Sequence, residues 1–348
     1  MLLNWLKEKD DYPKFYFESE GEVRAVCGAL DIVKHVPASD HCYYGGRDFF
    51  QKKRKRSDWD GFDQTCFFLP KYSRIERIKP QKQPPPLLKS GSIQELLSQN
   101  EHKKAVEAIL ESSLSKVVLA NSFIVELTSP CDPYLLLSSL SSENVIKFAI
   151  QWKKEGPIFI GTSPETFYKR SNRHLMMRAL AGTCRKEECE TAFLENKKER
   201  AEFDFVLDNI LKVLSPFSSK ISHSPVVPLE TASLRHLSSM VTADLDKSIT
   251  DEMLIEILHP TAALGGIPKK GALNMIQKLE PFDRGWYGAP IGYCSKEKAH
   301  FAVAIRSALV KQKSIQLFAG GGIVQGSKPE KEWNEINEKI SQFIKVLK

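Results

Sequence analysis

Two pairs of glutamates have the spacing best suited to chemistry in this chain. Glu199 and Glu202 lie three residues apart in the amphipathic stretch 197–214, and Glu332 and Glu335 repeat this spacing near the C-terminus. Residues three apart on a helix share one face, so two such helices could meet and hold a hard divalent cation. Mg²⁺ fits best, because it keeps some waters and also contacts the substrate. Taken alone, this spacing is more often a solvent-facing helix surface.

An arginine and a glycine run in the same part of the chain favour a small anionic ligand. The planar guanidinium of Arg306 can bind a carboxylate through two hydrogen bonds. Gly320, Gly321 and Gly322 would let the main chain approach closely and present its amides to an anion. As a bare pattern, a glycine run also serves simple turns.

Composition and cysteine usage limit the class of protein. The chain has 348 residues, 42% hydrophobic and 27% charged, which is typical of a globular protein with a large core. Charges at 7–11 interrupt the N-terminal stretch, and no window approaches about 18 apolar residues, which argues against secretion and membrane spanning. The seven cysteines are scattered without a CxxC pair. We therefore expect a cytoplasmic protein in a reducing setting.

The net charge of +7 owes much to the basic run QKKRKRS at 51–57. Such a run could indicate nucleic-acid binding. No interleaved aromatics or recognition helix accompany it, so we interpret it as a solvated loop between two strands and expect no nucleic-acid partner. A moderately basic surface would also attract a dianionic substrate.

The pattern of apolar residues predicts the main elements. Apolar alternation in 14–30 predicts a β-hairpin, and the β-branched stretch 116–127 predicts a strand. The proline-rich stretch 78–92 predicts a connector. Helical spacing after it predicts a helix with Ser92 as its N-cap and Glu95 three residues on.

The helix predicted over 197–214 should bury Phe205, Ile210, Leu211 and Leu214. For the chain as a whole, we expect residues 1–91 to be a strand-rich region and connector of the same fold. Residues 92–348 would form the catalytic core.

Six strings of the chain resemble motifs of the chorismate-utilising enzymes, in the same order, and most closely those of isochorismate synthases. They are KVVLA (116–120), GTSPETF (161–167), ALAGT (179–183), LHPTAALGGIP (258–268), FAVAIRSALV (301–310) and LFAGGGIVQGSKPEKEWNEINEK (317–339). The resemblance implies a mixed α/β, or α+β, fold of the anthranilate synthase component I type. In it, two antiparallel sheets pack together with helices outside.

The resemblance also implies the reaction and its residues. An isochorismate synthase converts chorismate to isochorismate by adding water at ring carbon 2 while the hydroxyl on carbon 4 leaves. Lys116 would be the base, its pKa lowered by partial desolvation, and Glu165 the acid, its pKa raised by its surroundings. The four glutamates would bind Mg²⁺. The implied substrate contacts are Gly182, Thr183, His236, Ala263, Leu264, Tyr287, Arg306, Gly320, Gly321, Gly322 and Lys339.

Single positions favour this subfamily. Lys116 stands where anthranilate synthases carry glutamine, and Ala181 where aminodeoxychorismate synthases carry a nucleophilic lysine. Ala263 stands where ammonia-using relatives and many salicylate synthases carry threonine. Asn121 and Phe203 replace an arginine and a histidine that are common in the family, and we expect both changes to lie behind the substrate-contacting residues.

The alternatives are a salicylate synthase, which adds pyruvate elimination, and a non-catalytic protein on the same scaffold. We expect a monomer whose product feeds menaquinone, siderophore or salicylate synthesis.

Overall fold

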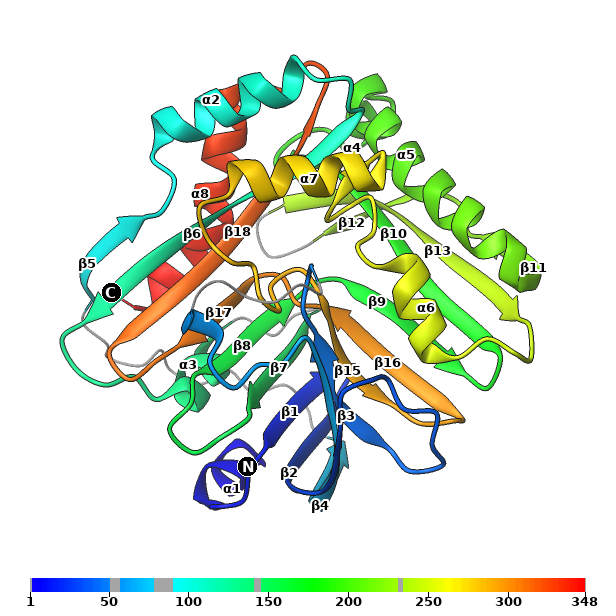
Figure 1. Cartoon of the computed structure of the whole chain (residues 1–348). Coiled ribbons are helices and arrows are strands. Elements are labelled where there is room, and N and C mark those ends of the chain that lie inside the picture. The colour runs from blue at the N-terminus through cyan, green and yellow to red at the C-terminus, as the bar shows by residue number, and fades with distance from the viewer. Residues whose placement is uncertain (1, 51–56, 78–89, 141–144, 231–233, 348) are drawn as a thin grey trace.

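The computed structural model describes residues 2–50, 57–77, 90–140, 145–230 and 234–347. Eight α-helices and eighteen strands fall within these ranges (Figure 1). The helices are α1 (Leu2–Glu8), α2 (Gln99–Leu110), α3 (Pro133–Ser139), α4 (Glu190–Leu194), α5 (Lys197–Leu214), α6 (Asp251–Leu258), α7 (Lys269–Leu279) and α8 (Pro329–Val346). The predicted mixture of helices and strands is confirmed.

The strands are antiparallel wherever they pair, and they are numbered in chain order. They are β1 (Lys14–Ser19), β2 (Glu22–Val33), β3 (Tyr43–Arg47), β4 (Thr65–Arg77), β5 (Ser90–Glu95), β6 (Lys116–Leu127), β7 (Ile146–Gln151), β8 (Ile158–Ser163), β9 (Thr166–Ser171), β10 (His174–Arg185), β11 (Ser218–His223), β12 (Val227–Glu230), β13 (Leu234–Leu245), β14 (Gly266–Ile267), β15 (Pro290–Cys294), β16 (Lys298–Val303), β17 (Ser307–Val310) and β18 (Ser314–Val324).

Hydrogen bonds join all these strands into one network with two arms. One arm runs from β5 through β6, β18, β17, β8 and β7 to β1. The other runs from β2 through β4, β3, β15, β16, β9 and β10 to β13. The β1–β2 hairpin connects them, so the two predicted sheets are continuous through their hydrogen bonds.

The arms face each other across an aromatic core, and the helices lie outside. The inner cluster includes Phe15 of β1, Phe159 of β8 and Phe318 of β18, which come from distant parts of the chain. Helices α5 and α6 pack against β10 and its neighbours in one arm, α3 and α8 pack against the other arm, and α1 packs against β2 of the connecting hairpin. Figure 1 shows α2, α7, α8 and α5 gathered at one end of the molecule, where β6 begins and β18 and β10 end.

Local sequence explains most element boundaries. The predicted hairpin forms, and its turn places Glu20 and Gly21 at positive φ angles of 53° and 76°, as a tight turn between twisted strands requires. The predicted strand 116–127 is confirmed as β6. The N-cap prediction at Ser92 is wrong, because residues Ser90–Glu95 form β5 and pair with β6. Helix α2 begins after Ser98, which repeats the same capping spacing with Glu101.

The helix predicted over 197–214 is confirmed as α5, but one of its core positions is wrong. Phe205 is 47% exposed, while Phe203 is fully buried. The buried positions of α5 follow the helical period from Phe203 through Val206, Leu207 and Ile210 to Leu214, and Phe205 lies outside that stripe. Phe203 therefore belongs to the core and not to the site.

Two predicted segments fall largely outside the described residues. Positions 51–56 of the basic run and 78–89 of the proline-rich connector are among them. The division at residue 91 stays a prediction, although β1 and β3 pair with β7 and β15 of the later region. None of the helices in the described ranges has the length and apolar character that crossing a membrane requires.

A buried ion pair joins Asp251 of α6 to Arg170 of β9. Arg170 donates to Asp251 through Nε at 2.9 Å and through Nη2 at 2.6 Å. The hydroxyl of Tyr168 donates to the same carboxylate at 2.9 Å. Both charged side chains are almost fully buried, at 7% and 5% exposure, so each depends on the other for charge compensation.

Substitution Asp251→Ala should therefore lower the free energy of unfolding by about 3 to 5 kcal/mol, since it leaves a buried guanidinium without a counter-charge. Asp10→Ala, which removes an exposed ion pair with Lys154, should change it little. Urea unfolding followed by circular dichroism measures both. Equal effects of the two substitutions would contradict this account of the buried pair.

Candidate active site

The site is built around the first residue of β6. Lys116 pairs in register with Val324 at the end of β18, and its side chain is only 2% exposed. Its amine donates to Glu202 Oε1 of α5 at 2.8 Å. A buried ammonium needs such a partner, because burial without charge compensation is costly. The structure thus brings Lys116 and Glu202, both predicted for the site, into direct contact.

Gly322 of β18 leaves room for this ion pair. A Cβ atom at position 322 would stand 2.9 Å from Lys116 Cε and 3.2 Å from Glu202 Oε1. A Cβ at Gly321 would lie 3.5 Å from Glu332 Oε2 and 3.9 Å from Glu335 Oε1. The glycine run therefore lies against the Lys116–Glu202 pair at Gly322 and against the α8 glutamates at Gly321.

Glu165 lies in the turn between β8 and β9 and faces the same region. Its carboxyl is buried, and burial raises its pKa to about 7, against the opposing effect of the Lys116 charge. Its main chain is fixed on both sides: the Glu165 amide donates to Ser163 Oγ at 3.1 Å, and its carbonyl accepts from Val303 at 3.0 Å. A carboxylic acid with this pKa is half protonated near neutral pH and can give or take a proton.

A bulge in β10 brings the α5 carboxylates to the strand. Gly182 has a φ of +67°, and the register with β13 shifts between Ala181 and Thr183. The turned-out amide of Thr183 donates to Glu199 Oε2 at 2.7 Å. Thr183 Oγ1 also lies 3.1 Å from His236 Nδ1. Sequence-predicted residues from β10, β13 and α5 thus contact one another directly.

His236 is held as a neutral imidazole. Burial, together with the charges of Lys339 and Arg306, lowers its pKa to about 4. The ring therefore carries one donor and one acceptor at neutral pH. The two named charges also place His236 near the cations predicted to contact substrate.

Helix α8 contributes Lys339, Glu335 and Glu332 to the site. Lys339 Nζ donates to Glu335 Oε1 and to the carbonyl of Gly320, both at 2.7 Å, which ties α8 to β18. Burial, together with the charges of Glu335 and Glu202, raises the pKa of Glu332 to about 7, against a lowering hydrogen bond from Ser327. Because the charge of Glu202 on α5 affects the pKa of Glu332 on α8, the two predicted glutamate pairs lie near each other.

The residue types of the site suit a hard divalent cation, but the carboxylates are not arranged as a complete metal site. Across the described ranges, no three His, Cys, Asp or Glu side chains lie close enough to form a metal site on their own. Glu202 and Glu335 are ion-paired, and Glu199 accepts an amide. Mg²⁺ commonly uses one or two carboxylates together with water and substrate oxygens, and the buried Glu332, repelled by its neighbours, fits such a role.

Arg306 is the remaining cation of the site. It has a φ of +48°, a strained angle for a residue with a side chain, and such angles cluster at functional sites. Burial lowers its pKa to about 10. It has no ion-pair partner among the residues that the structure describes, so its fork remains available to an anion.

The other predicted contacts lie around these groups. Tyr287 is buried and stacks on Phe318 with 5.2 Å between ring centroids. Ala263 and Leu264 lie in the loop between α6 and β14, where the carbonyl of Leu264 accepts from Arg284 Nη1 at 3.1 Å. Whether these three touch the substrate stays a prediction.

Several residues around the site were not singled out for the roles they have. Asn121, expected behind the substrate contacts, binds the main chain of Leu97 through both its amide atoms at 2.9 Å. Ser327 hydrogen-bonds Glu332. Glu280 and Arg284 form a buried pair against β6. Both residues lie beyond the end of α7, which is at Leu279, so no helical pattern indicated the pair or the strand that it contacts.

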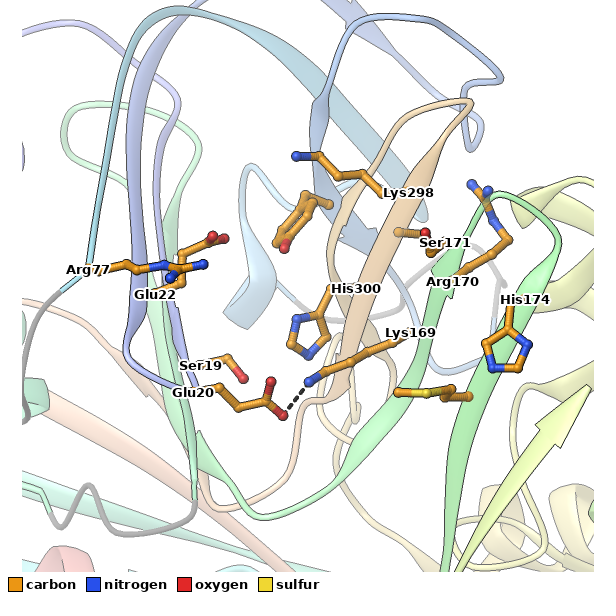
Figure 2. Close-up of a pocket in the computed structure, with 13 residues that line it drawn as sticks. Ser19, Glu20, Glu22, Arg77, Lys169, Arg170, Ser171, His174, Lys298 and His300 are labelled. Carbon is orange, nitrogen blue, oxygen red and sulfur yellow. Dashed lines mark hydrogen bonds and ion pairs between the residues drawn. The ribbon is translucent and has the colours of Figure 1, made fainter. Parts of the chain in front are cut away.

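A separate hollow lies away from these residues. Figure 2 shows a cavity of about 630 Å³ whose lining includes Glu20, Lys169, Lys298 and His300, with an ion pair between Lys169 and Glu20. None of the residues predicted for the site is among those that line it. The chemistry described above is therefore not located there.

Comparison with known proteins decides the family. The family model for chorismate binding enzymes matches residues 73–348. The chain belongs to this family. It is 29% identical to an isochorismate synthase, MenF, of Pasteurella multocida (strain Pm70), over 99% of this chain and 90% of the relative. It is 34% identical to MenF of Bacillus subtilis (strain 168), over 73% of this chain and 56% of the relative.

Solved structures of the family establish the fold. The Escherichia coli MenF structure superposes with a TM-score of 0.86 at 24% identity, covering 99% of this chain and 91% of the other. Anthranilate synthase component I from Streptococcus pneumoniae TIGR4 superposes with a TM-score of 0.71 at 18% identity, covering 96% and 91%. The predicted family and its fold are confirmed.

The raised pKa of Glu165 predicts how its substitution changes stability. Because the folded state holds this proton more tightly than the unfolded chain does, ionisation between pH 4.5 and about 7 destabilises the fold. Glu165→Gln removes this cost, so at pH 8 the variant should be more stable than the unsubstituted protein by on the order of 2 to 3 kcal/mol. The difference should shrink below pH 5. Urea unfolding at pH 5 and pH 8 measures it, and a difference independent of pH would contradict the assignment.

Proposed function

We propose that this protein is an isochorismate synthase that converts chorismate to isochorismate with Mg²⁺. The observation that supports the proposal most is that a buried amine, Lys116, lies near enough to a buried carboxyl, Glu165, for its charge to act on that carboxyl's pKa of about 7. The named relatives and the family match agree with it. An acid and a base at one site are what a hydroxyl exchange on a ring needs.

The proposed chemistry balances in one exchange. The Lys116 amine first gives a proton to the Glu202 carboxylate that it contacts. The neutral amine then removes a proton from a water molecule, whose oxygen bonds to ring carbon 2. The ring double bonds shift, the bond from carbon 4 to its hydroxyl breaks, and Glu165 gives that oxygen a proton so that it leaves as water. The pKa of about 7 leaves a substantial fraction of Glu165 protonated at neutral pH.

The remaining groups would bind the charged parts of the substrate. The Arg306 fork suits one carboxylate of chorismate. Gly320 and Gly321 allow the β18 main chain to approach a ligand, and Lys339 fixes that strand to α8. Neutral His236 with Thr183 offers hydrogen bonds without adding a further charge.

Mg²⁺ would be held by Glu332 together with the other glutamates of the α5 and α8 pairs. When bound, it would neutralise these carboxylates and coordinate a carboxylate of the substrate. The chain's own contribution is to bring α5 and α8 together at the end of β18.

Single residues support hydroxyl exchange over the reactions of related enzymes. Lys116 offers a base for water, and Ala181 offers no nucleophile. Ala263 favours release of isochorismate over elimination of pyruvate. As the resemblance to isochorismate synthases implies, we propose that the enzyme acts as a monomer. Its product would supply a menaquinone, siderophore or salicylate pathway.

Incubation of the protein with chorismate and Mg²⁺ should produce isochorismate, measured by liquid chromatography. Lys116→Ala and Glu165→Gln should each lower kcat by at least about 100-fold, the usual range for loss of acid–base catalysis. Glu187→Gln, a change of a carboxylate outside the site, should leave it unchanged. Salicylate with pyruvate as the main products would instead support the salicylate synthase alternative. No turnover of chorismate at any Mg²⁺ concentration would contradict the proposal.

Loss of one α8 carboxylate should weaken the binding of the metal that the reaction needs. Glu332→Ala should weaken Mg²⁺ binding in the presence of chorismate, and added metal should not restore activity. Calorimetric titration of Mg²⁺ in the inactive Lys116→Ala background measures this binding without turnover. Glu338→Ala, on the same helix but ion-paired to Arg185, is the matched control. Full activity in a chelator would rule out the metal.

A further inference from the structure

One edge of β6 lacks a neighbouring strand over the residues that follow Lys116 and Val117. On this edge β14 pairs with Lys116 and Val117, and β5 pairs from Phe123 onward. Among the described residues, no strand pairs with the stretch 118–121 on that side, whereas β18 pairs along the whole opposite edge. The main-chain groups in this gap are buried, so each needs a partner.

Two side chains and one loop carbonyl supply those partners. The Val118 amide donates to the Gly265 carbonyl at 2.9 Å. The Val118 carbonyl accepts from Arg284 Nη2 at 2.7 Å, and the Ala120 amide donates to Glu280 Oε1 at 2.8 Å. An ion pair thus takes the place of a strand at the edge that continues from Lys116.

The pair is rigid and fully enclosed. Arg284 donates to Glu280 through Nε at 2.8 Å and Nη2 at 2.5 Å, and the two side chains are 1% and 2% exposed. The guanidinium also lies 4.4 Å above the ring of Phe49. A planar fork with fixed donor directions can make these contacts together, whereas a lysine ammonium cannot.

Arg284 also reaches the loop that carries the predicted subfamily position. Its Nη1 donates to the Leu264 carbonyl at 3.1 Å, next to Ala263. One guanidinium therefore connects the strand that presents Lys116 to the loop of Ala263 and Leu264. A buried ion pair contributes little to stability compared with apolar packing, so its value here lies in the geometry that it imposes.

We propose that Arg284 and Glu280 are positioning residues of the reaction, which hold the Lys116 amine at a fixed place relative to the 263–264 segment. The proposal rests on the proposed function. Neither side chain touches the substrate in this account. They act through the main chain of β6, two and four residues beyond Lys116.

The test is Arg284→Lys, which keeps the charge and removes the fork. It should lower kcat by about 10- to 100-fold, as misplacement of a catalytic group by about 1 Å does. KM should change by less than about threefold, because Arg306 and the glycine run are untouched. Chorismate binding to the inactive Lys116→Ala background, measured by calorimetry, should likewise change less than threefold when Arg284→Lys is added.

Arg170→Lys is the matched control. It removes the fork of another buried arginine–carboxylate pair that does not contact β6, so it should lower the melting temperature similarly without lowering kcat. If Arg284→Lys does not fold, Glu280→Gln replaces it: this amide can still accept from Ala120 but loses the ion pair, and kcat should again fall with KM nearly unchanged.

The outcomes separate the two proposals. An unsubstituted protein that makes no isochorismate refutes the proposed function. An active protein whose Arg284→Lys and Glu280→Gln variants keep kcat within threefold refutes the positioning role. A loss of kcat in Arg170→Lys equal to that in Arg284→Lys also refutes it, since general destabilisation would then explain both.

Discussion

The burial of the Lys116 ammonium is the constraint on which the rest of the site depends. A charged amine that is 2% exposed must have a counter-charge, and Glu202 supplies it from a helix 86 residues later in the chain. This contact fixes α5 against the ends of β6 and β18. The glycine at position 322 leaves room for it, since a Cβ there would stand 2.9 Å from the lysine side chain and force it to shift.

The other charges of the site follow from the same requirement. Lys339 is compensated by Glu335, and together with the Lys116–Glu202 pair this leaves Arg306, Glu332 and the proposed acid Glu165 without ion pairs among the described residues. Apart from Glu165, one cation and one carboxyl therefore remain to meet a ligand. A substrate carboxylate can satisfy the arginine, and a divalent cation can satisfy the glutamate, which is the combination expected for chorismate with Mg²⁺.

Much of this arrangement was predictable from sequence because the signals are local. The β-branched run of β6 and the long amphipathic stretches of α5 and α8 predicted their elements within about two residues. The motif strings predicted which residues would gather: Lys116 contacts Glu202, and Thr183 contacts both Glu199 and His236. The first helix was misplaced because Ser92 and Ser98 carry the same capping spacing, and only the pairing of Ile93 with Val125 in β6 distinguishes them.

What the sequence could not reveal depends on partners far apart in the chain. Phe205 was expected in the core because it is apolar, but the phase of α5 is set by packing against β10 and β13. Glu280 binds the main chain of Ala120, 160 residues earlier. Main-chain groups have no side-chain signature, so no pattern of residues could indicate that an ion pair completes the edge of β6.

The proposed exchange requires Lys116 and Glu165 to act from opposite sides of one substrate ring. A crystal structure of the Glu165→Gln variant with chorismate and Mg²⁺ tests it most directly. The account predicts that the Lys116 amine faces ring carbon 2 and that the substituted amide side chain at position 165 faces the hydroxyl on carbon 4 from the other side. A ring bound with both side chains on the same face, or with either one out of reach, would contradict it.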